Sequence, residues 1–134
     1  MKCLFVTGTR ADFGKMKGLI SALSSDESRY SIQIVATGMH LLTEFGSTLV
    51  EIENTFPNKV VQIKGQKFQE NMANGFARFI SGFNLHLESE KPDVVLVHGD
   101  RFDALGAAIA ASNMGIHVVH IEGGEVSGTI DEAI

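Results

Sequence analysis

Hydrophobic positions follow two different spacings along the chain. Between Met16 and Leu23, apolar side chains recur at every third or fourth position, as on one face of a helix, whereas residues 94–97 form one continuous apolar run. Read in this way, the sequence predicts strands over residues 4–6, 32–36, 60–63, 94–97 and 116–121. It predicts helices over residues 16–23, 41–53, 72–87 and 104–114, the third ending ahead of Pro92 and the fourth at Gly115.

Strands and helices alternate in this pattern, which is typical of βαβ units and a parallel sheet. The strands over residues 94–97 and 116–121 are almost entirely apolar, as expected where helices cover both faces of a sheet. His117 lies inside the last strand and is interpreted as a structural residue. The pattern therefore predicts the α/β class, with a Rossmann-like parallel sheet and helices on both of its faces.

The composition is that of one folded domain. Of the 134 residues, 44% are hydrophobic and 20% are charged, which excludes intrinsic disorder. No window approaches the ~18 consecutive apolar residues of a membrane span, and the net charge of −5 argues against a nucleic-acid-binding surface. Cys3, the single cysteine, lies in the first apolar run and is interpreted as a small buried hydrophobe. That run is too short for a signal peptide, so we expect a cytoplasmic protein.

Candidate chemistry lies where the predicted strands end, because ligands of open parallel sheets bind beyond the carboxyl ends of the strands. Polar residues and glycines follow four of the strands, over residues 7–15, 37–40, 98–103 and 120–125. The first loop is not a P-loop, since Gly8 and Gly14 are too far apart and Met16 stands where Ser or Thr is required; it also lacks the dinucleotide fingerprint. ATP hydrolysis and NAD binding are therefore disfavoured, although a diphosphate could bind at the next helix N-terminus beside Arg10.

Two His-x-acid pairs follow the last two predicted strands: His98 with Asp100, and His120 with Glu122. If these strands are neighbours, two histidines and two carboxylates converge, which suits acid–base chemistry or a divalent metal. The alternative is two buried, hydrogen-bonded histidines beside solvated acids. Residues 99–103 also fit the short G-D-x-x-D element of metallophosphoesterases, but the Asp-x-His that such enzymes need on the first strand is missing.

Residues 98–104 and 120–131, together with residues 9–12, closely resemble the hydrolysing UDP-N-acetylglucosamine 2-epimerases, which initiate the synthesis of sialic acid and related nonulosonic acids. The resemblance covers the whole chain, and the motif over residues 120–131 is long enough to be specific. It implies two Rossmann-like domains that face each other across a cleft, as in glycosyltransferase-B enzymes, with residues 1–134 as most of the N-terminal domain. We expect a longer protein, because a helix is predicted to begin close to Ile134.

The resemblance also implies roles for single residues and a reaction. Matched position by position, the family's functional residues are the catalytic acids Asp100, Glu122 and Asp131 and the UDP contacts Arg10, Ala11 and Arg101. His98 and His120 are expected to orient the site. The implied reaction eliminates UDP from UDP-N-acetylglucosamine to give 2-acetamidoglucal, to which water adds to give N-acetylmannosamine. No cofactor and no obligatory metal is implied.

The residues themselves are compatible with this chemistry. Three carboxylates can provide the base and the acid, and two arginines can stabilise the charge that develops on UDP, but which carboxylate is base and which is acid stays open. For Asp12, an exposed surface charge is the alternative to a role in the site. Because the other half of the cleft is missing from these residues, we expect the chain alone to be inactive and its uncovered face to favour a homo-oligomer.

Three other functions remain open at this stage. The substrate could be a 2,4-diacetamido sugar nucleotide, which the motifs do not separate from UDP-N-acetylglucosamine. A non-hydrolysing 2-epimerase is disfavoured, because residues 123–131 resemble the hydrolysing type. A stand-alone nucleotide-binding module is the alternative from another class. In each case the expected partner is a UDP-sugar or another nucleotide, with no nucleic acid and no membrane.

Overall fold

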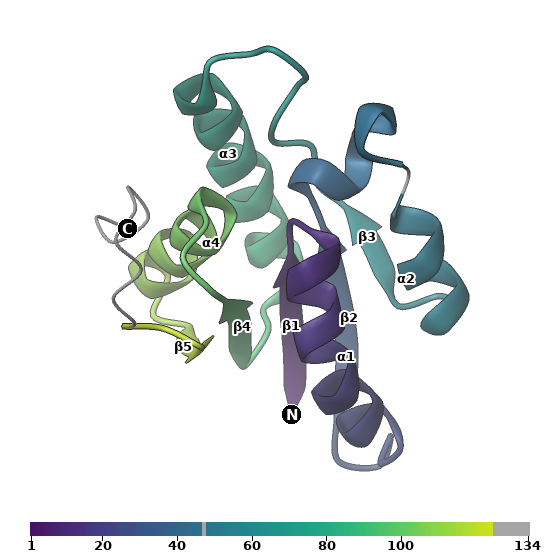
Figure 1. The fold of residues 1–134 in the computed structure, drawn as a ribbon. Helices are drawn as coiled ribbons and strands as arrows, with labels where there is room; N and C mark the ends of the chain where they lie inside the picture. The colour runs from purple at the N-terminus through teal and green to yellow at the C-terminus, as the bar shows by residue number, and fades with distance from the viewer. Residues whose placement is uncertain (47, 125–134) are drawn as a thin grey trace.

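A parallel five-stranded sheet forms the centre of the molecule. The computed structural model describes residues 1–46 and 48–124. Its strands are β1 (Lys2–Thr7), β2 (Ser31–Ala36), β3 (Val60–Gln62), β4 (Val94–His98) and β5 (His117–Ile121). They are arranged in the order β3-β2-β1-β4-β5, and every neighbouring pair is parallel (Figure 1). The predicted α/β class and parallel sheet are confirmed.

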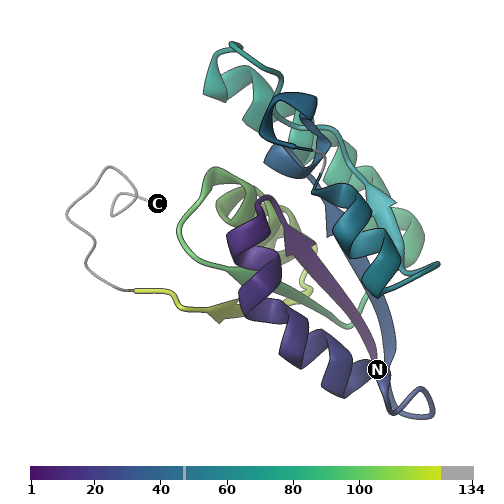
Figure 2. The ribbon, with the colours of Figure 1, turned by 45° about the vertical axis from the view of Figure 1, so that its right-hand side comes forward.

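Helices cover both faces of this sheet. They are α1 (Arg10–Ser24), α2 (Leu49–Thr55), α3 (Met72–Glu90) and α4 (Phe102–Asn113). On one face, side chains of α1 and α2 pack against Phe5 of β1 and its neighbours, and on the other face α3 and α4 pack against Leu4 and Val6. Because successive residues of a strand point to opposite faces, β1 contributes to both halves of the core. Figure 2 shows α1 lying along β1.

Local signals in the sequence fix where these helices begin and end. Thr9 and Asp12 form a capping box at the start of α1, in which the Thr9 side chain accepts from the Asp12 backbone N–H. Helix α3 ends at Glu90, with Lys91 as its C-cap directly before Pro92, and Gly115 follows α4 with φ of 70°. The predicted ends of both helices are confirmed.

The helix predicted over residues 41–53 is wrong for most of its length. Two 3-10 turns, Gly38–Leu41 and Thr43–Phe45, replace its first half, and α2 begins only afterwards. Gly46, with φ of 85°, ends the second turn in a left-handed conformation that continues no helix. The side chain of His40 is buried beneath these turns, so tertiary contacts override the helical periodicity.

Strand β5 is less covered than its apolar sequence predicted. It is the outermost strand of the described sheet, and His117, Val119 and His120 are exposed. The interpretation of His117 as a structural residue stays a prediction, to which the structure adds that the residue is exposed. Cys3, in contrast, is buried as expected.

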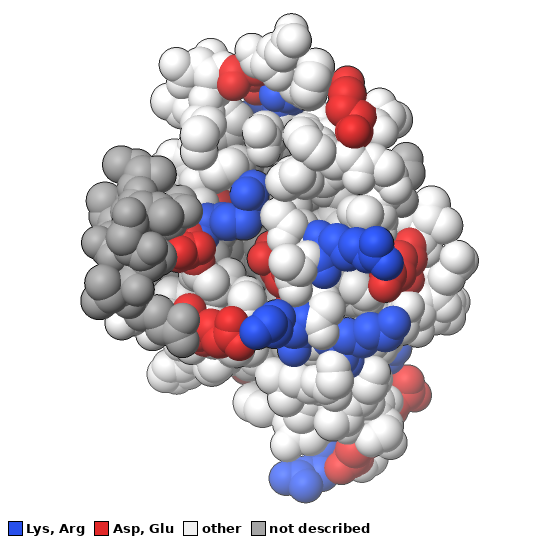
Figure 3. All heavy atoms as spheres, in the orientation of Figure 1, with Lys and Arg blue, Asp and Glu red and all other residues white. Residues whose placement is uncertain are grey.

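Charged side chains on the face shown in Figure 3 are mixed in sign. Arg10 pairs with Glu51, and Lys15 pairs with Glu122, so basic residues lie beside acidic ones instead of forming a separate basic patch. Within residues 1–46 and 48–124, no helix has the length and apolar character that crossing a bilayer requires.

Candidate functional site

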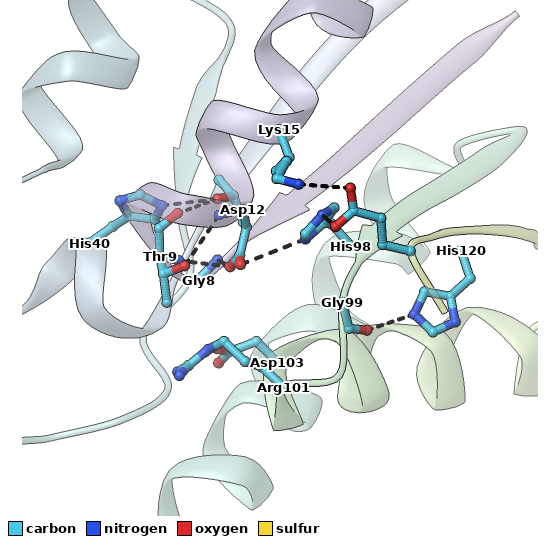
Figure 4. Close-up of polar contacts among 12 residues, drawn as sticks. Gly8, Thr9, Asp12, Lys15, His40, His98, Gly99, Arg101, Asp103 and His120 are labelled. Atoms are coloured by element: carbon cyan, nitrogen blue, oxygen red, sulfur yellow. Dashed lines mark hydrogen bonds and ion pairs between the residues drawn. The ribbon is translucent and has the colours of Figure 1, made fainter. Parts of the chain in front are cut away.

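The polar ends of four strands meet at one edge of the sheet. From β1, the chain adds β2 and β3 on one side of the sheet and then β4 and β5 on the other, so the strand order switches direction between β1 and β4. Because β1 and β4 are parallel neighbours, their carboxyl ends lie side by side. The residues drawn in Figure 4 come from the ends of these four strands, from the loops that follow them and from the first turns of α1 and α4. Open α/β sheets bind ligands at such a switch point.

A line of polar contacts joins α1, the end of β4 and the loop after β5. Lys15 Nζ of α1 donates to Glu122 Oε1 at 2.9 Å, and the other oxygen of Glu122 lies 3.1 Å from His98 Nε2. The second nitrogen of His98, Nδ1, is 3.8 Å from Asp12 Oδ1 and has no hydrogen-bond partner among the described residues. His98 is thus held between two carboxylates that come from opposite ends of the sequence.

Glu122 has both an unusual backbone and a perturbed carboxyl group. Its φ of 54° lies in the left-handed region, which non-glycine residues adopt at a cost and keep where a site requires it. The hydrogen bond from Lys15, and less strongly the one from His98, lower the pKa of Glu122 below its ordinary value. A lowered pKa favours the carboxylate, which is the form that can accept a proton.

Asp12, in the first turn of α1, binds the loop after β1 through its side chain. Its Oδ2 accepts the backbone N–H groups of Gly8 and Thr9, at 3.2 and 2.9 Å, while Oδ1 faces His98 (Figure 4). The Asp12 side chain is only 13% exposed, so an exposed surface charge is the wrong interpretation. The same carboxylate caps α1 and lines the site.

The loop after β4 is tied to the end of β5. Gly99 donates its N–H to the carbonyl of Ile121, and its own carbonyl accepts from His120 Nε2 at 2.6 Å (Figure 4). These two bonds position Asp100, which is exposed at the strand end. The alternative of two buried histidines does not hold for His120, which is exposed and bonds to backbone, whereas the His98 side chain is only 9% exposed.

The remaining residues expected in the site lie around this centre. Arg10, at the first position of α1, is exposed and pairs with Glu51 of α2 at 3.2 Å, and Ala11 beside it is exposed as well. Arg101 begins the turn into α4 and donates to Asp103. Asp131 lies outside the described residues.

His40 is a buried residue of this region that the sequence did not single out. Thr7 Oγ1 donates to the carbonyl of Thr9, so His40 Nε2 donates to Thr7 Oγ1 at 2.9 Å, and Nδ1 accepts from Thr48 at 2.6 Å. Burial lowers the pKa of His40, which favours the neutral imidazole. Its position directly after the Thr-Gly end of β2 was the available signal.

A cavity of about 450 Å³ lies beside His40, away from Glu122. It is bounded by the turns before α2 and the segment after β3, with Leu49, Gln62, Lys64 and Arg78 among its lining residues. Among the described residues, none of those expected in the site lines this cavity.

The donor set at the strand ends suits proton transfer and anion binding. The cluster offers carboxylates at Asp12, Asp100 and Glu122, and guanidinium groups at Arg10 and Arg101. Within residues 1–46 and 48–124, no group of three or more His, Cys, Asp or Glu side chains is placed to hold a metal ion.

Comparison with known proteins places this chain among sugar-nucleotide enzymes. The family model for UDP-N-acetylglucosamine 2-epimerase matches residues 22–134. Two relatives are each 40% identical over 99% of this chain: UDP-N,N'-diacetylbacillosamine 2-epimerase (hydrolyzing) of Legionella pneumophila and UDP-N-acetylglucosamine 2-epimerase of Neisseria meningitidis. The chain spans only 36% and 35% of their respective lengths.

Solved structures agree with these sequence relatives. The UDP-GlcNAc 2-epimerase of Neisseria meningitidis bound to UDP-GlcNAc superposes with a TM-score of 0.75 at 31% identity, covering 92% of this chain and 32% of that one. The Methanocaldococcus jannaschii enzyme in complex with UDP-GlcNAc and UDP gives 0.76 at 28% identity, covering 96% and 34%. The fold of this chain therefore matches about a third of each of these structures.

Proposed function

The chain belongs to the UDP-N-acetylglucosamine 2-epimerase family, and we propose that the whole protein is a hydrolysing 2-epimerase that converts UDP-N-acetylglucosamine to UDP and N-acetylmannosamine. The observation that carries the proposal is the 40% identity, over 99% of this chain, to a relative whose name specifies the hydrolysing reaction. In the proposed enzyme, residues 1–134 form most of the N-terminal domain.

In this proposal the reaction runs in two stages. A base removes the proton at C2 of the sugar while the bond between C1 and the UDP oxygen breaks, which leaves a double bond between C1 and C2. Water then adds, with its oxygen on C1 and a proton delivered to C2 from the opposite face. The sum is one sugar nucleotide and one water giving UDP and the epimeric free sugar.

The described side chains support particular roles in these stages. Glu122 is the proposed base, because Lys15 and His98 lower its pKa and so favour its carboxylate form. Arg10 and Arg101 are proposed to stabilise the charge that develops on the departing diphosphate. Asp100 and Asp131 supply the remaining proton transfers, and His120 supports the Asp100 loop.

The test is incubation of the whole protein with UDP-N-acetylglucosamine in ²H₂O, with the products identified by NMR. We expect UDP and free N-acetylmannosamine that carries deuterium at C2. UDP-N-acetylmannosamine as the sole product would instead indicate a non-hydrolysing enzyme. Glu122→Gln, which keeps the shape but cannot accept the proton, should lower kcat by about 10²- to 10⁴-fold.

A second substrate has specific support. The relatives from Legionella pneumophila and Campylobacter jejuni, at 40% and 35% identity, are named for UDP-N,N'-diacetylbacillosamine and GDP/UDP-N,N'-diacetylbacillosamine. The same experiment should therefore be carried out in parallel with UDP-N,N'-diacetylbacillosamine as the substrate. A much higher kcat/KM for the diacetamido sugar would reassign the substrate and leave the reaction unchanged.

A further inference from the structure

Asp103 is a buried carboxyl group to which no role has yet been given. It is the second residue of α4 and is 2% exposed. Its Oδ2 accepts from Nε and from one terminal nitrogen of Arg101, at 3.2 and 3.1 Å, and its Oδ1 has no hydrogen-bond partner among the described residues. Burying a carboxyl group without full compensation is costly, so its presence needs a reason.

Two glycines from other loops make room for this side chain. A Cβ atom at Gly8, after β1, would stand 2.2 Å from Asp103 Oδ2, and one at Gly38, after β2, would stand 3.0 Å from the same oxygen. Gly38 also has a φ of 53°, but Gly8 has no such conformation that would require glycine. At Gly8 the space taken by Asp103 is therefore the reason for glycine, and three strand-end loops close around one carboxyl group.

The geometry of this contact constrains Arg101 more than a single ion pair would. Two N–H groups of one guanidinium meet one carboxylate oxygen, which fixes the plane of the guanidinium as well as its position (Figure 4). A guanidinium carries five N–H donors, so three remain after this contact. The Arg101 side chain is 29% exposed, so these donors can reach a ligand at the strand ends.

We propose that Asp103 is a positioning residue, seated between Gly8 and Gly38, that holds the Arg101 guanidinium in the orientation that receives the diphosphate of the bound and departing UDP. The inference rests on the proposed function for the identity of the anion. A fixed guanidinium loses little side-chain entropy when the diphosphate binds, whereas a freely rotating one has to be ordered at that moment. Asp103 also reduces the net positive charge near the anion, which by itself weakens diphosphate binding. The proposal therefore requires that the gain in affinity from orienting Arg101 exceeds this loss.

The test measures UDP affinity of the whole protein by calorimetry, and KM and kcat for the sugar nucleotide. Asp103→Asn keeps the shape but gives up the ionic acceptor, and we expect UDP affinity to fall about tenfold or more, with KM rising in parallel. Arg101→Ala should weaken UDP binding at least as much. If Asp103 acts through Arg101, adding Asp103→Asn to Arg101→Ala changes UDP affinity by less than about twofold.

Gly8→Ala tests the same idea without altering either charged residue. The added methyl group occupies the space of Asp103 Oδ2, so it should displace the carboxyl group and weaken UDP binding as Asp103→Asn does. Gly14→Ala is the matched control, because its Cβ would meet no atom within 4 Å, and it should leave UDP affinity unchanged. Arg101→Lys keeps the charge and the buried carboxyl group, and a loss of affinity from this variant supports orientation even if the other variants fold poorly.

The outcomes separate this inference from the proposed function. Wild-type protein that binds UDP but releases none from a sugar nucleotide contradicts the function, and the variants still decide the role of Asp103. The inference would be overturned if Asp103→Asn or Arg101→Lys kept the full UDP affinity of the wild-type protein. It would also be overturned if Asp103→Asn lowered UDP affinity as much in the Arg101→Ala protein as in the wild-type protein. Wild-type protein that binds no UDP would overturn it as well.

Discussion

Residues that are distant in the sequence lower the pKa of Glu122. Lys15 approaches it from α1 and His98 from β4, which the topology places next to β5. The sequence predicted that His98 and Glu122 converge if their strands are neighbours, and they do. It gave no sign of Lys15, because contact between α1 and the end of β5 depends on how the helix crosses the sheet.

Removing Lys15 should move the pH dependence of the enzyme. Lys15 lowers the pKa of Glu122, so Lys15→Met raises that pKa toward its ordinary value. A base with a raised pKa becomes protonated at higher pH, and the acid limb of kcat/KM should shift to higher pH. The profile of the whole protein measures this. Lys17→Met, on the same helix with its Nζ over the Phe13 ring, is the control, and an equal shift in both variants would contradict the assignment.

His40 should make stability depend on pH. Burial lowers its pKa in the folded protein, so as the pH falls below about 6.5 the unfolded chain takes up a proton that the folded protein resists. The contribution of neutral His40 to the free energy of unfolding is therefore complete above that pH and declines below it. His40→Asn should cost about 1–3 kcal/mol near pH 7.5 by disturbing its bonds to Thr7 and Thr48. The loss should shrink at pH 5.5 in urea unfolding; a constant difference would argue against a neutral, buried His40.

At the scale of helices and strands, most of the architecture follows from periodicity and end signals. The sequence predicts the strand–helix alternation, the end of α3 before Pro92 and the turn at Gly115, because each is determined by residues that are close together in the sequence. The helix prediction fails for the segment after β2, because Gly46 and the buried His40 determine the backbone conformation there. Asp103 was equally unpredictable, since its burial is created by glycines in two other loops.

The apolar stripe of α3 provides an element-scale prediction. Phe83 is fully buried and stacks on Phe79 with ring centroids 5.3 Å apart, whereas Leu85, two residues later, is 64% exposed. Phe83→Ala should destabilise the protein by about 3–5 kcal/mol, because it removes a buried ring and leaves a cavity. Leu85→Ala is the matched control on the same helix, with an expected change within about 0.5 kcal/mol. Urea unfolding measures both, and equal losses would contradict the placement of α3.

At the scale of the whole molecule, Asp100, Arg10 and Ala11 are exposed at the carboxyl edge of the sheet. Of the expected site residues that the structure describes, none lines the cavity near His40. The relatives are almost three times as long as this chain, which covers 36% and 35% of the first two. We therefore propose that the rest of the protein supplies the opposite wall of the site.

This arrangement predicts that residues 1–134 alone do not turn over sugar nucleotide. Holding a substrate between two rigid walls is worth about 7–11 kcal/mol in favourable cases, and a single wall loses most of that advantage even with Glu122, His98 and Arg101 in place. Purified residues 1–134, shown by circular dichroism to be folded, should release no measurable UDP from UDP-N-acetylglucosamine, while the whole protein does. Addition of the remaining residues as a separate chain should restore part of the activity if the two associate. Turnover by residues 1–134 at a rate near that of the whole protein would refute a shared site and place the complete catalytic apparatus on this domain.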